Sequence, residues 1–382
     1  MNKTAVVVIP TYNEAETIGE MVDHLFNKTF PKAIGWECKL LVVDAQSPDG
    51  TADIVKGKQK NHDNLEVFVE QKKEGIGAAY VKGFRYAMDK MNADVLIEFD
   101  GDFQHPPDRI PIMLKEIDSG YDYVLGSRKI KGGSNPKGWG FKRVFFSEVG
   151  GLVARFVLFF PFKHFFNITD PTTGLKASRV KGFVDKMDMD KLYSRQFGYK
   201  LEFLYKMVNL GAKVKEIPLE FQLRKAGESK ITGQTAKDIF RTVFLLRWHD
   251  ETTQKFIKFG TVGFIGYLVN ATGIAVFANA GFREWAVWGL ATELAIISNF
   301  TLNNLWTFKE EQFKTITKVI SKFLQFNFTS AGALIIQTVA GSLLTFAFGP
   351  QYRQVYLPFI IVLLVLPYNW LMYNKVIWRN KS

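Results

Sequence analysis

Residues 94–107, DVLIEFDGDFQHPP, join a short apolar run to a group of acidic and polar side chains. The run Val95–Ile97 has the composition of a buried strand, and two aspartates, Asp100 and Asp102, follow it. Two carboxylates this close together, partly removed from water, repel each other unless another group compensates their charge. The stretch therefore predicts a sheet strand that ends at a binding site for a positively charged ligand.

Similar apolar runs recur along the first part of the chain, and helical patterns separate them. The runs are TAVVVIP, CKLLVVD, LEVFVE and YDYVLGS, at residues 4–10, 38–44, 65–70 and 121–127. Stretches such as EAETIGEMVDHLFNK (14–28) and GAAYVKGFRYAMDKM (77–91) have the apolar spacing of helices. Strands that alternate with helices predict an α/β fold with a mostly parallel mixed sheet.

Polar side chains also follow other predicted strands. PTYNE (10–14) ends the first strand, Asp44 ends the second, and GSR (126–128) ends the fifth. Ligands of such sheets bind beyond the carboxyl ends of the strands. We therefore expect these groups to converge with Asp100 and Asp102 on one cleft.

A divalent cation would remove the conflict between the two aspartates. Mg²⁺ and Mn²⁺ prefer oxygen ligands and are commonly held by one or two carboxylates together with substrate phosphates. The i, i+2 spacing turns both carboxylates the same way in an extended chain, and Gln104 could supply a neutral third oxygen. The alternative is a solvated Asp-Gly turn without a ligand.

The composition changes near residue 250. Four long segments with hardly any charge follow, at residues 256–280, 285–308, 323–349 and 355–378. Because a helix rises about 1.5 Å per residue and the hydrocarbon core is about 30 Å thick, roughly 20 residues suffice to cross a bilayer. The segments predict an all-α domain of four transmembrane helices, with the buried helices of a soluble bundle as the alternative.

Basic residues are distributed unevenly around these segments. Loops that contain only Arg283 or Arg353 alternate with basic flanks, which carry Lys255, Lys258, Lys309, Lys314, Lys318, Lys322, Lys375, Arg379 and Lys381. By the positive-inside rule, we expect a multi-pass protein of the cell membrane with both termini and the first 250 residues in the cytoplasm. Glu293, within the second segment, is expected to pair with neighbouring polar side chains.

The charge of the chain suits an anionic partner. Its 382 residues include 49 Lys and Arg against 37 Asp and Glu, a formal net charge of +12. Nucleic acids, anionic lipids and phosphorylated substrates all fit this excess, but no groove-reading or base-stacking module appears, so we expect no nucleic-acid partner. The single cysteine, Cys38, excludes an internal disulfide and a cysteine-cluster metal site.

Seven motifs together resemble those of dolichol-phosphate mannose synthases, which belong to glycosyltransferase family 2 and have the GT-A fold. They are VVIPTYNEAETI, LVVDAQSPDGTADIV, GIGAAYVKGFRYA, DGDFQHPPDRIP, GSR, DPTTGLKASR and GYKLEFLYKMVNLGAKVKEIPLEFQLRKAGESK. The resemblance covers about residues 4–232. The segments KFGTVGFIGYLVN and NFTLNNLWTF resemble the GtrA-like four-helix membrane proteins, over roughly residues 255–380.

The resemblance implies a role for each motif residue. Those implied to hold the nucleotide sugar are Pro10, Tyr12, Glu14, Asp44, Gly75 and Gly77. Asp100, Asp102 and Gln104 would bind Mg²⁺ or Mn²⁺, and Asp170 would lie near the sugar. The residues implied to bind the acceptor phosphate are Arg128, Arg143, Ser147, Arg224 and Lys230.

The resemblance also implies the activity and the division of the chain. We expect a cytoplasmic catalytic domain at 1–232, including an interface helix within 134–166, an amphipathic helix at 233–254 and a membrane domain at 255–382. The enzyme would transfer mannose from GDP-mannose to dolichyl phosphate with inversion. A glucosyltransferase that uses UDP-glucose is the nearer alternative, and a flippase of lipid-linked sugar is the more distant one.

Overall fold

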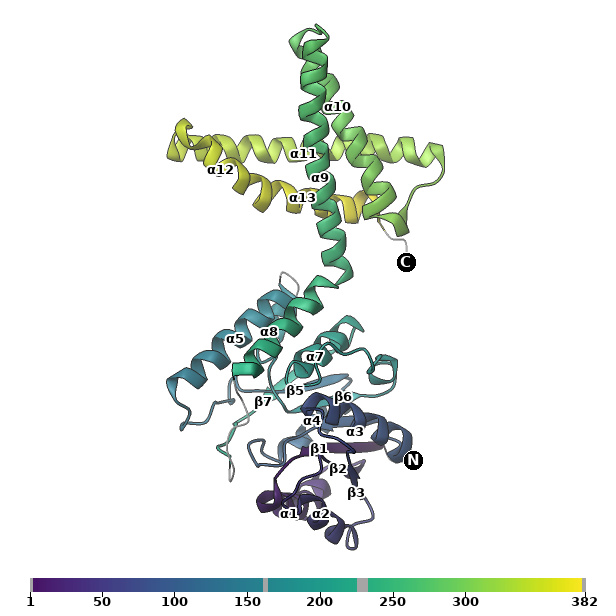
Figure 1. Cartoon of the computed structure of the whole chain (residues 1–382), viewed down its shortest axis with the longest axis vertical. Coiled ribbons are helices and arrows are strands. Elements are labelled where there is room, and N and C mark those ends of the chain that lie inside the picture. Colours follow the sequence, from purple (N-terminus) through teal and green to yellow (C-terminus); the bar gives the residue numbers. More distant parts are fainter. Residues whose placement is uncertain (1–2, 161–163, 225–232, 380–382) are drawn as a thin grey trace. The chain divides into compact units, whose positions relative to one another are not determined.

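The computed structural model describes residues 3–160, 164–224 and 233–379. By its internal contacts the chain divides into two compact units, Met1–Arg247 and Trp248–Ser382 (Figure 1). The first unit contains a sheet covered by helices, and the second is helical.

The first unit is built on a seven-stranded sheet in the order β3-β2-β1-β4-β6-β5-β7. Its strands are β1 Lys3–Thr11, β2 Trp36–Asp44, β3 Leu65–Val69, β4 Val95–Glu98, β5 Tyr123–Ser127, β6 Lys176–Arg179 and β7 Val214–Pro218. β6 is antiparallel to β4 and to β5, and the other pairs are parallel. The predicted mostly parallel mixed sheet is therefore confirmed.

Both faces of the central strands are buried, as their apolar composition requires. In β1, Val6 and Val8 point into one core cluster, while Val7 and Ile9 point into another. The helices of this unit are α1 Ala15–His24, α2 Thr51–Gln59, α3 Ile76–Met91, α4 Arg109–Asp118, α5 Phe141–Phe159, α6 His164–Asn167, α7 Tyr199–Asn209 and α8 Gly233–Trp248. The sheet and its helices together fix where the strand ends lie.

Helices α5 and α8 each expose an apolar stripe. Their inner residues, such as Leu158 and Leu246, belong to one core cluster. The exposed residues recur every three or four positions and are Phe141, Phe145, Val149, Leu152 and Phe156 on α5, and Phe240, Phe244 and Trp248 on α8. Each of these two helices therefore buries one face and exposes the other.

The second unit consists of long apolar helices. They are α9 Glu251–Asn279, α10 Glu284–Leu302, α11 Ile316–Phe348, α12 Arg353–Ile360 and α13 Leu366–Met372, with π-helical segments at Asn303–Thr307, Ile361–Val365 and Tyr373–Ile377. Among the described residues, Glu251–Asn279 and Pro358–Ile377 are long and apolar enough to cross a membrane. The predicted four crossings remain a prediction.

Candidate active site

The loop after β4 holds the predicted metal ligands in a buried turn. Asp102 is 3% exposed, and its Oδ1 atom accepts a 2.9 Å hydrogen bond from the backbone N–H of Gln104. Its Oδ2 atom lies 2.8 Å from one terminal nitrogen of Arg224, and the other terminal nitrogen lies 3.7 Å from Glu14 Oε1. The fold thus gathers four residues from three distant parts of the sequence.

The pKa values of the two aspartates are shifted in opposite directions: that of Asp102 is raised and that of Asp100 is lowered. Burial and the neighbouring Asp100 together raise the pKa of Asp102 to about 6, because they outweigh the hydrogen bond from Gln104 and the positive charge of Arg224. Burial would also raise the pKa of Asp100, but Lys200, His105 and Arg224 outweigh it and lower this pKa. The loop therefore keeps negative charge that the surrounding side chains compensate only in part.

Three groups of this site were not predicted from the sequence. The Tyr80 hydroxyl donates to the Phe99 carbonyl at 3.2 Å and lies 3.4 Å from Asp100 Oδ1. His105 Nδ1 lies 3.4 Å from Asp100 Oδ2, and burial lowers the pKa of His105 to about 4. Lys200 approaches the same place, because a Cβ atom on Gly174 would lie 2.6 Å from its Nζ and 3.2 Å from Asp100 Oδ2.

Residue type alone could not identify these three groups. Two of them, Tyr80 and Lys200, lie in helices α3 and α7, far from the acidic loop in the sequence. His105 stands inside the quoted motif, three residues after Asp102. Its position close to two aspartates in the sequence is the feature that could have indicated that His105 belongs to the site.

The donor set fits a hard divalent cation that takes its remaining ligands from a substrate. In the described part of the chain, no group of three or more His, Cys, Asp or Glu side chains could hold a metal by itself. Asp100 and Asp102 supply carboxylate oxygens, and burial together with the like charge of Asp100 raises the pKa of Asp102. Magnesium and manganese sites of this kind commonly use only one or two carboxylates plus phosphate oxygens.

The ends of β1 and β2 lie side by side. Thr11 pairs with Asp44 in register, and Pro10 pairs with Val43. Asp44 is fully buried, and its carboxylate accepts hydrogen bonds from the Thr11 hydroxyl at 2.9 Å and the Ser47 hydroxyl at 2.6 Å. The Lys73 ammonium lies 3.1 Å from the centroid of the Tyr12 ring. These contacts give the predicted nucleotide residues a fixed framework.

The loop before α3 requires glycine. Gly75 has φ +123°, and a Cβ atom there would lie 2.5 Å from the Arg195 carbonyl oxygen. The Gly77 N–H donates to that same carbonyl at 2.9 Å. The predicted glycine loop is therefore packed against the segment that precedes α7.

Arg128 and Asp170 form a buried, two-pronged ion pair. Arg128 Nε lies 2.6 Å from one carboxylate oxygen, and a terminal nitrogen lies 2.7 Å from the other. Glu216 holds the Asp170 loop, because its carboxylate accepts the backbone N–H groups of Thr169 and Asp170 at 2.7 and 2.9 Å. Arg128 lowers the pKa of Asp170 although burial alone would raise it. Arg128 and Asp170 were both predicted to contact substrate, and in the structure each fixes the position of the other.

Three further residues, Arg143, Ser147 and Lys230, were predicted to bind the acceptor phosphate. Burial lowers the pKa of Arg143, and the positive charges of Arg224 and Arg128 lower it further, so the three guanidinium groups are close. Ser147 lines a cavity of about 270 Å³ together with Lys129, Arg155 and Asp170. Lys230 lies outside the described residues.

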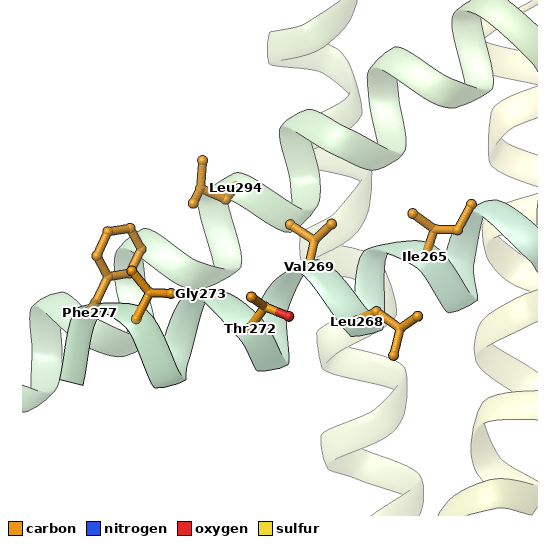
Figure 2. A pocket seen from close by; sticks show the side chains of 8 residues that line it. Ile265, Leu268, Val269, Thr272, Gly273, Phe277 and Leu294 are labelled. Carbon is orange, nitrogen blue, oxygen red and sulfur yellow. The ribbon is translucent and has the colours of Figure 1, made fainter. Parts of the chain in front are cut away.

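A second cavity, of about 380 Å³, lies in the helical unit between α9 and α10. Figure 2 shows its apolar side chains, among them Ile265, Val269, Phe277 and Leu294. None of the predicted site residues lines it. The chemistry described above therefore belongs to the first unit.

Two families of known proteins match this chain in tandem. Glycosyl transferase family 2 matches residues 6–183, and the GtrA/DPMS transmembrane domain matches residues 258–378. A dolichol-phosphate mannosyltransferase of Pyrococcus furiosus is 31% identical over 341 residues, which are 89% of this chain and 90% of the relative. An undecaprenyl-phosphate mannosyltransferase of Micrococcus luteus is 32% identical over 63% of this chain and 94% of its own.

A solved structure resembles the chain more distantly. Mannosyl-3-phosphoglycerate synthase from Rubrobacter xylanophilus is 19% identical, with a TM-score of 0.45 over 64% of this chain and 75% of its own.

Proposed function

The chain belongs to the dolichol-phosphate mannosyltransferases of glycosyltransferase family 2, and we propose that it transfers mannose from GDP-mannose to dolichyl phosphate or a related polyprenyl phosphate. The observation that supports the proposal is that carboxylates and arginine side chains lie close together in the first unit. The Asp102 carboxylate is buried and lies 2.8 Å from Arg224, and the Asp100 carboxylate is 26% exposed beside it. Burial and then the positive charge of Arg224 lower the pKa of Arg143. A charged donor and a phosphate acceptor need this combination.

The donor is assigned to the strand ends of β1, β2 and β4. Pro10, Tyr12, Glu14, Asp44 and the glycine loop at Gly75 and Gly77 would hold the nucleotide. Asp100, Asp102 and the amide oxygen of Gln104 would hold Mg²⁺ or Mn²⁺, which when bound neutralises charge on the leaving diphosphate. For that to happen, the Arg224 guanidinium must give up its contact with Asp102.

The acceptor is assigned to the arginines. Arg143, Ser147, Arg224 and Lys230 would bind the lipid phosphate, and the planar fork of arginine can contact two of its oxygens. Arg128 would contribute positive charge while it holds Asp170 beside the sugar. Because a phosphate monoester with a second pKa near 6 is largely dianionic at neutral pH, no general base is needed. Direct attack by this oxygen on the anomeric carbon would invert the sugar linkage.

A membrane location is supported by two exposed apolar stripes and by the helical unit. The stripes on α5 and α8 suit helices that lie in the membrane interface with their basic side chains toward lipid phosphates. We infer a multi-pass protein with four crossings, whose catalytic unit and termini face the cytoplasm. We propose the domain boundaries expected from the sequence, with a catalytic domain at 1–232, an amphipathic helix at 233–254 and a membrane domain at 255–382.

A transfer assay tests the function. Purified protein in detergent receives labelled GDP-mannose or UDP-glucose with dolichyl phosphate and Mn²⁺, and label entering the organic phase is counted. We expect transfer from GDP-mannose that EDTA abolishes and that Asp102→Asn reduces by about a hundredfold or more. The exposed Asp63, in the loop before β3, supplies the matched control Asp63→Asn, which should be fully active.

Two other results would contradict parts of the proposal. Transfer only from UDP-glucose would preserve the enzyme class and replace the sugar. No transfer from either donor, with several polyprenyl phosphates, would refute the transferase proposal.

A further inference from the structure

Trp139 lies between the arginines of the acceptor side. The Cζ atom of Arg143 is 4.1 Å from the centroid of its ring, and that of Arg128 is 5.9 Å away. Phe221 packs edge-on against the indole, with ring centroids 5.7 Å apart and planes at 75°. One aromatic side chain thus contacts two guanidinium groups. These groups repel each other because both are positively charged.

The two arginines differ in how they are held. Arg128 is fixed by its two-pronged ion pair with Asp170. The Arg143 guanidinium forms no hydrogen bond or ion pair with any residue in the described part of the chain. The positive charges of Arg224 and Arg128 lower its pKa, which means that they repel it. The Trp139 ring face is therefore the contact that opposes this repulsion, since an aromatic face attracts a cation.

A second observation indicates that a polar ligand belongs here. The Trp139 Nε1 atom is buried and has no hydrogen-bond partner among the described residues. Buried donors are almost always paired in proteins, with the protein, with water or with a ligand. The Arg143 guanidinium also has its donors available, and an anion with several oxygens could accept from both.

The local backbone explains why these two side chains meet. The Trp139 N–H donates to the Pro136 carbonyl at 3.1 Å, which closes a turn, and Gly140 then precedes the first residue of α5. The Arg143 N–H bonds to the Gly140 carbonyl at 3.0 Å, so Arg143 lies in the first turn of the helix. The spacing of four residues brings indole and guanidinium to the same side of the chain.

We propose that Trp139 is a positioning residue of the acceptor site, which holds the Arg143 guanidinium in the orientation that receives the phosphate of the lipid. This inference rests on the proposed function, and it adds a residue that the sequence analysis did not identify. Trp139 acts through Arg143 and is not a catalytic residue.

Steady-state kinetics of two substitutions test the proposal. Trp139→Ala should raise KM for a polyprenyl phosphate about tenfold while KM for GDP-mannose stays unchanged, because the contact that holds Arg143 and the indole donor are both lost on the acceptor side. Trp139→Phe keeps an aromatic face but has no indole N–H, so it should recover the part of the loss that comes from the contact with Arg143. Equal changes in both KM values, or no change in either, would overturn the proposal.

The chain offers a closely matched control for these variants. Trp36 is likewise a tryptophan beside a cation, because Lys3 Nζ lies 5.3 Å from its ring centroid, but its indole N–H is paired and donates to Asp118 Oδ2 at 2.9 Å. It is the first residue of β2, at the opposite end of the strand from the site residue Asp44. Trp36→Phe should leave both KM values unchanged, whereas a rise of acceptor KM in it would assign the Trp139 effect to general loosening of the fold.

A double-mutant cycle and a binding measurement complete the test. If the two residues act as a unit, Trp139→Ala combined with Arg143→Ala should weaken acceptor binding no more than Arg143→Ala alone, and additive losses would overturn the proposal. Calorimetric titration with farnesyl phosphate, using farnesol and inorganic phosphate for comparison, reports this binding without catalysis. Wild-type protein that binds farnesyl phosphate but transfers no mannose refutes the function alone, and a Trp139→Ala variant that binds it normally refutes this inference alone.

Discussion

Arg128 and Asp170 depend on each other because both are removed from water. Their side chains are 9% and 1% exposed. Arg128→Ala leaves a buried carboxylate without its partner, so we expect the free energy of unfolding to fall by about 3–5 kcal/mol. The thermal midpoint of the purified protein in detergent measures this loss. Arg85→Ala breaks a pair whose side chains are 44% and 76% exposed, and it should change the midpoint little.

The same pair predicts how this loss depends on pH. Arg128 lowers the pKa of Asp170 below its ordinary value of 3.8, so the pair stabilises the folded protein fully above that value and less as the pH falls through the lowered pKa. In Arg128→Ala the buried carboxyl can be relieved by taking up a proton. The difference in midpoint between wild type and variant should therefore be widest at neutral pH and narrow in acid, and a constant difference would contradict the assignment.

Single residues also show where sequence reasoning ends. Asp100, Asp102 and Asp44 could be placed at strand ends because the length of an apolar run fixes where a strand stops. The cation that compensates Asp102 could not be derived this way, because Arg224 follows it by more than a hundred residues and only the resemblance indicated its role. Trp139 gave no signal of its own, since an isolated tryptophan is compatible with any core.

Among the strands, β4 could be predicted easily from the sequence, and β6 could not. β4 is a buried apolar run and was predicted, whereas β6 reads KASR and was not. Lys176 in β6 is nevertheless fully buried, because its Nζ atom donates to the Lys200 carbonyl at 2.6 Å and lies opposite Glu98 in the strand pair. Burial lowers the pKa of Lys176 to about 8. Such a strand is specified by partners distant in sequence, which local composition cannot reveal.

Helix α5 predicts a membrane contact that can be measured residue by residue. Cys38 is the single cysteine and is buried, so a spin label on Leu152→Cys or Phe156→Cys reports one position. In liposomes we expect these labels to collide more with oxygen than with a water-soluble nickel complex, because both side chains are over half exposed on the apolar stripe. A label on Ile34→Cys, 88% exposed before β2, should behave as an aqueous site. Aqueous behaviour at 152 and 156 would remove α5 from the interface.

For the whole molecule, the distribution of basic residues predicts the path of the chain through the membrane. The flanks at 255–258, 309–322 and 375–381 are basic, and the intervening loops carry one arginine each. Four crossings would place all three basic flanks on the side of the catalytic unit and would return the C-terminus to that side. Two crossings would also return the C-terminus to the side of the catalytic unit, but they would leave all the loops between them on the opposite side of the membrane.

Cysteine labelling in intact cells distinguishes these paths. Phe282→Cys and Gln351→Cys lie in the weakly charged loops and Thr315→Cys in a basic one, and all three positions are exposed. With Cys38 buried, a membrane-impermeant maleimide should label 282 and 351 from outside and 315 only after the cells are permeabilised. Labelling of all three positions in intact cells would indicate two crossings, and labelling of 315 without 282 and 351 would indicate the reversed orientation. Reversed orientation would move the catalytic unit away from a cytoplasmic donor and would contradict the proposed reaction, whereas two crossings would correct the number of spans and leave the catalytic unit on the cytoplasmic side.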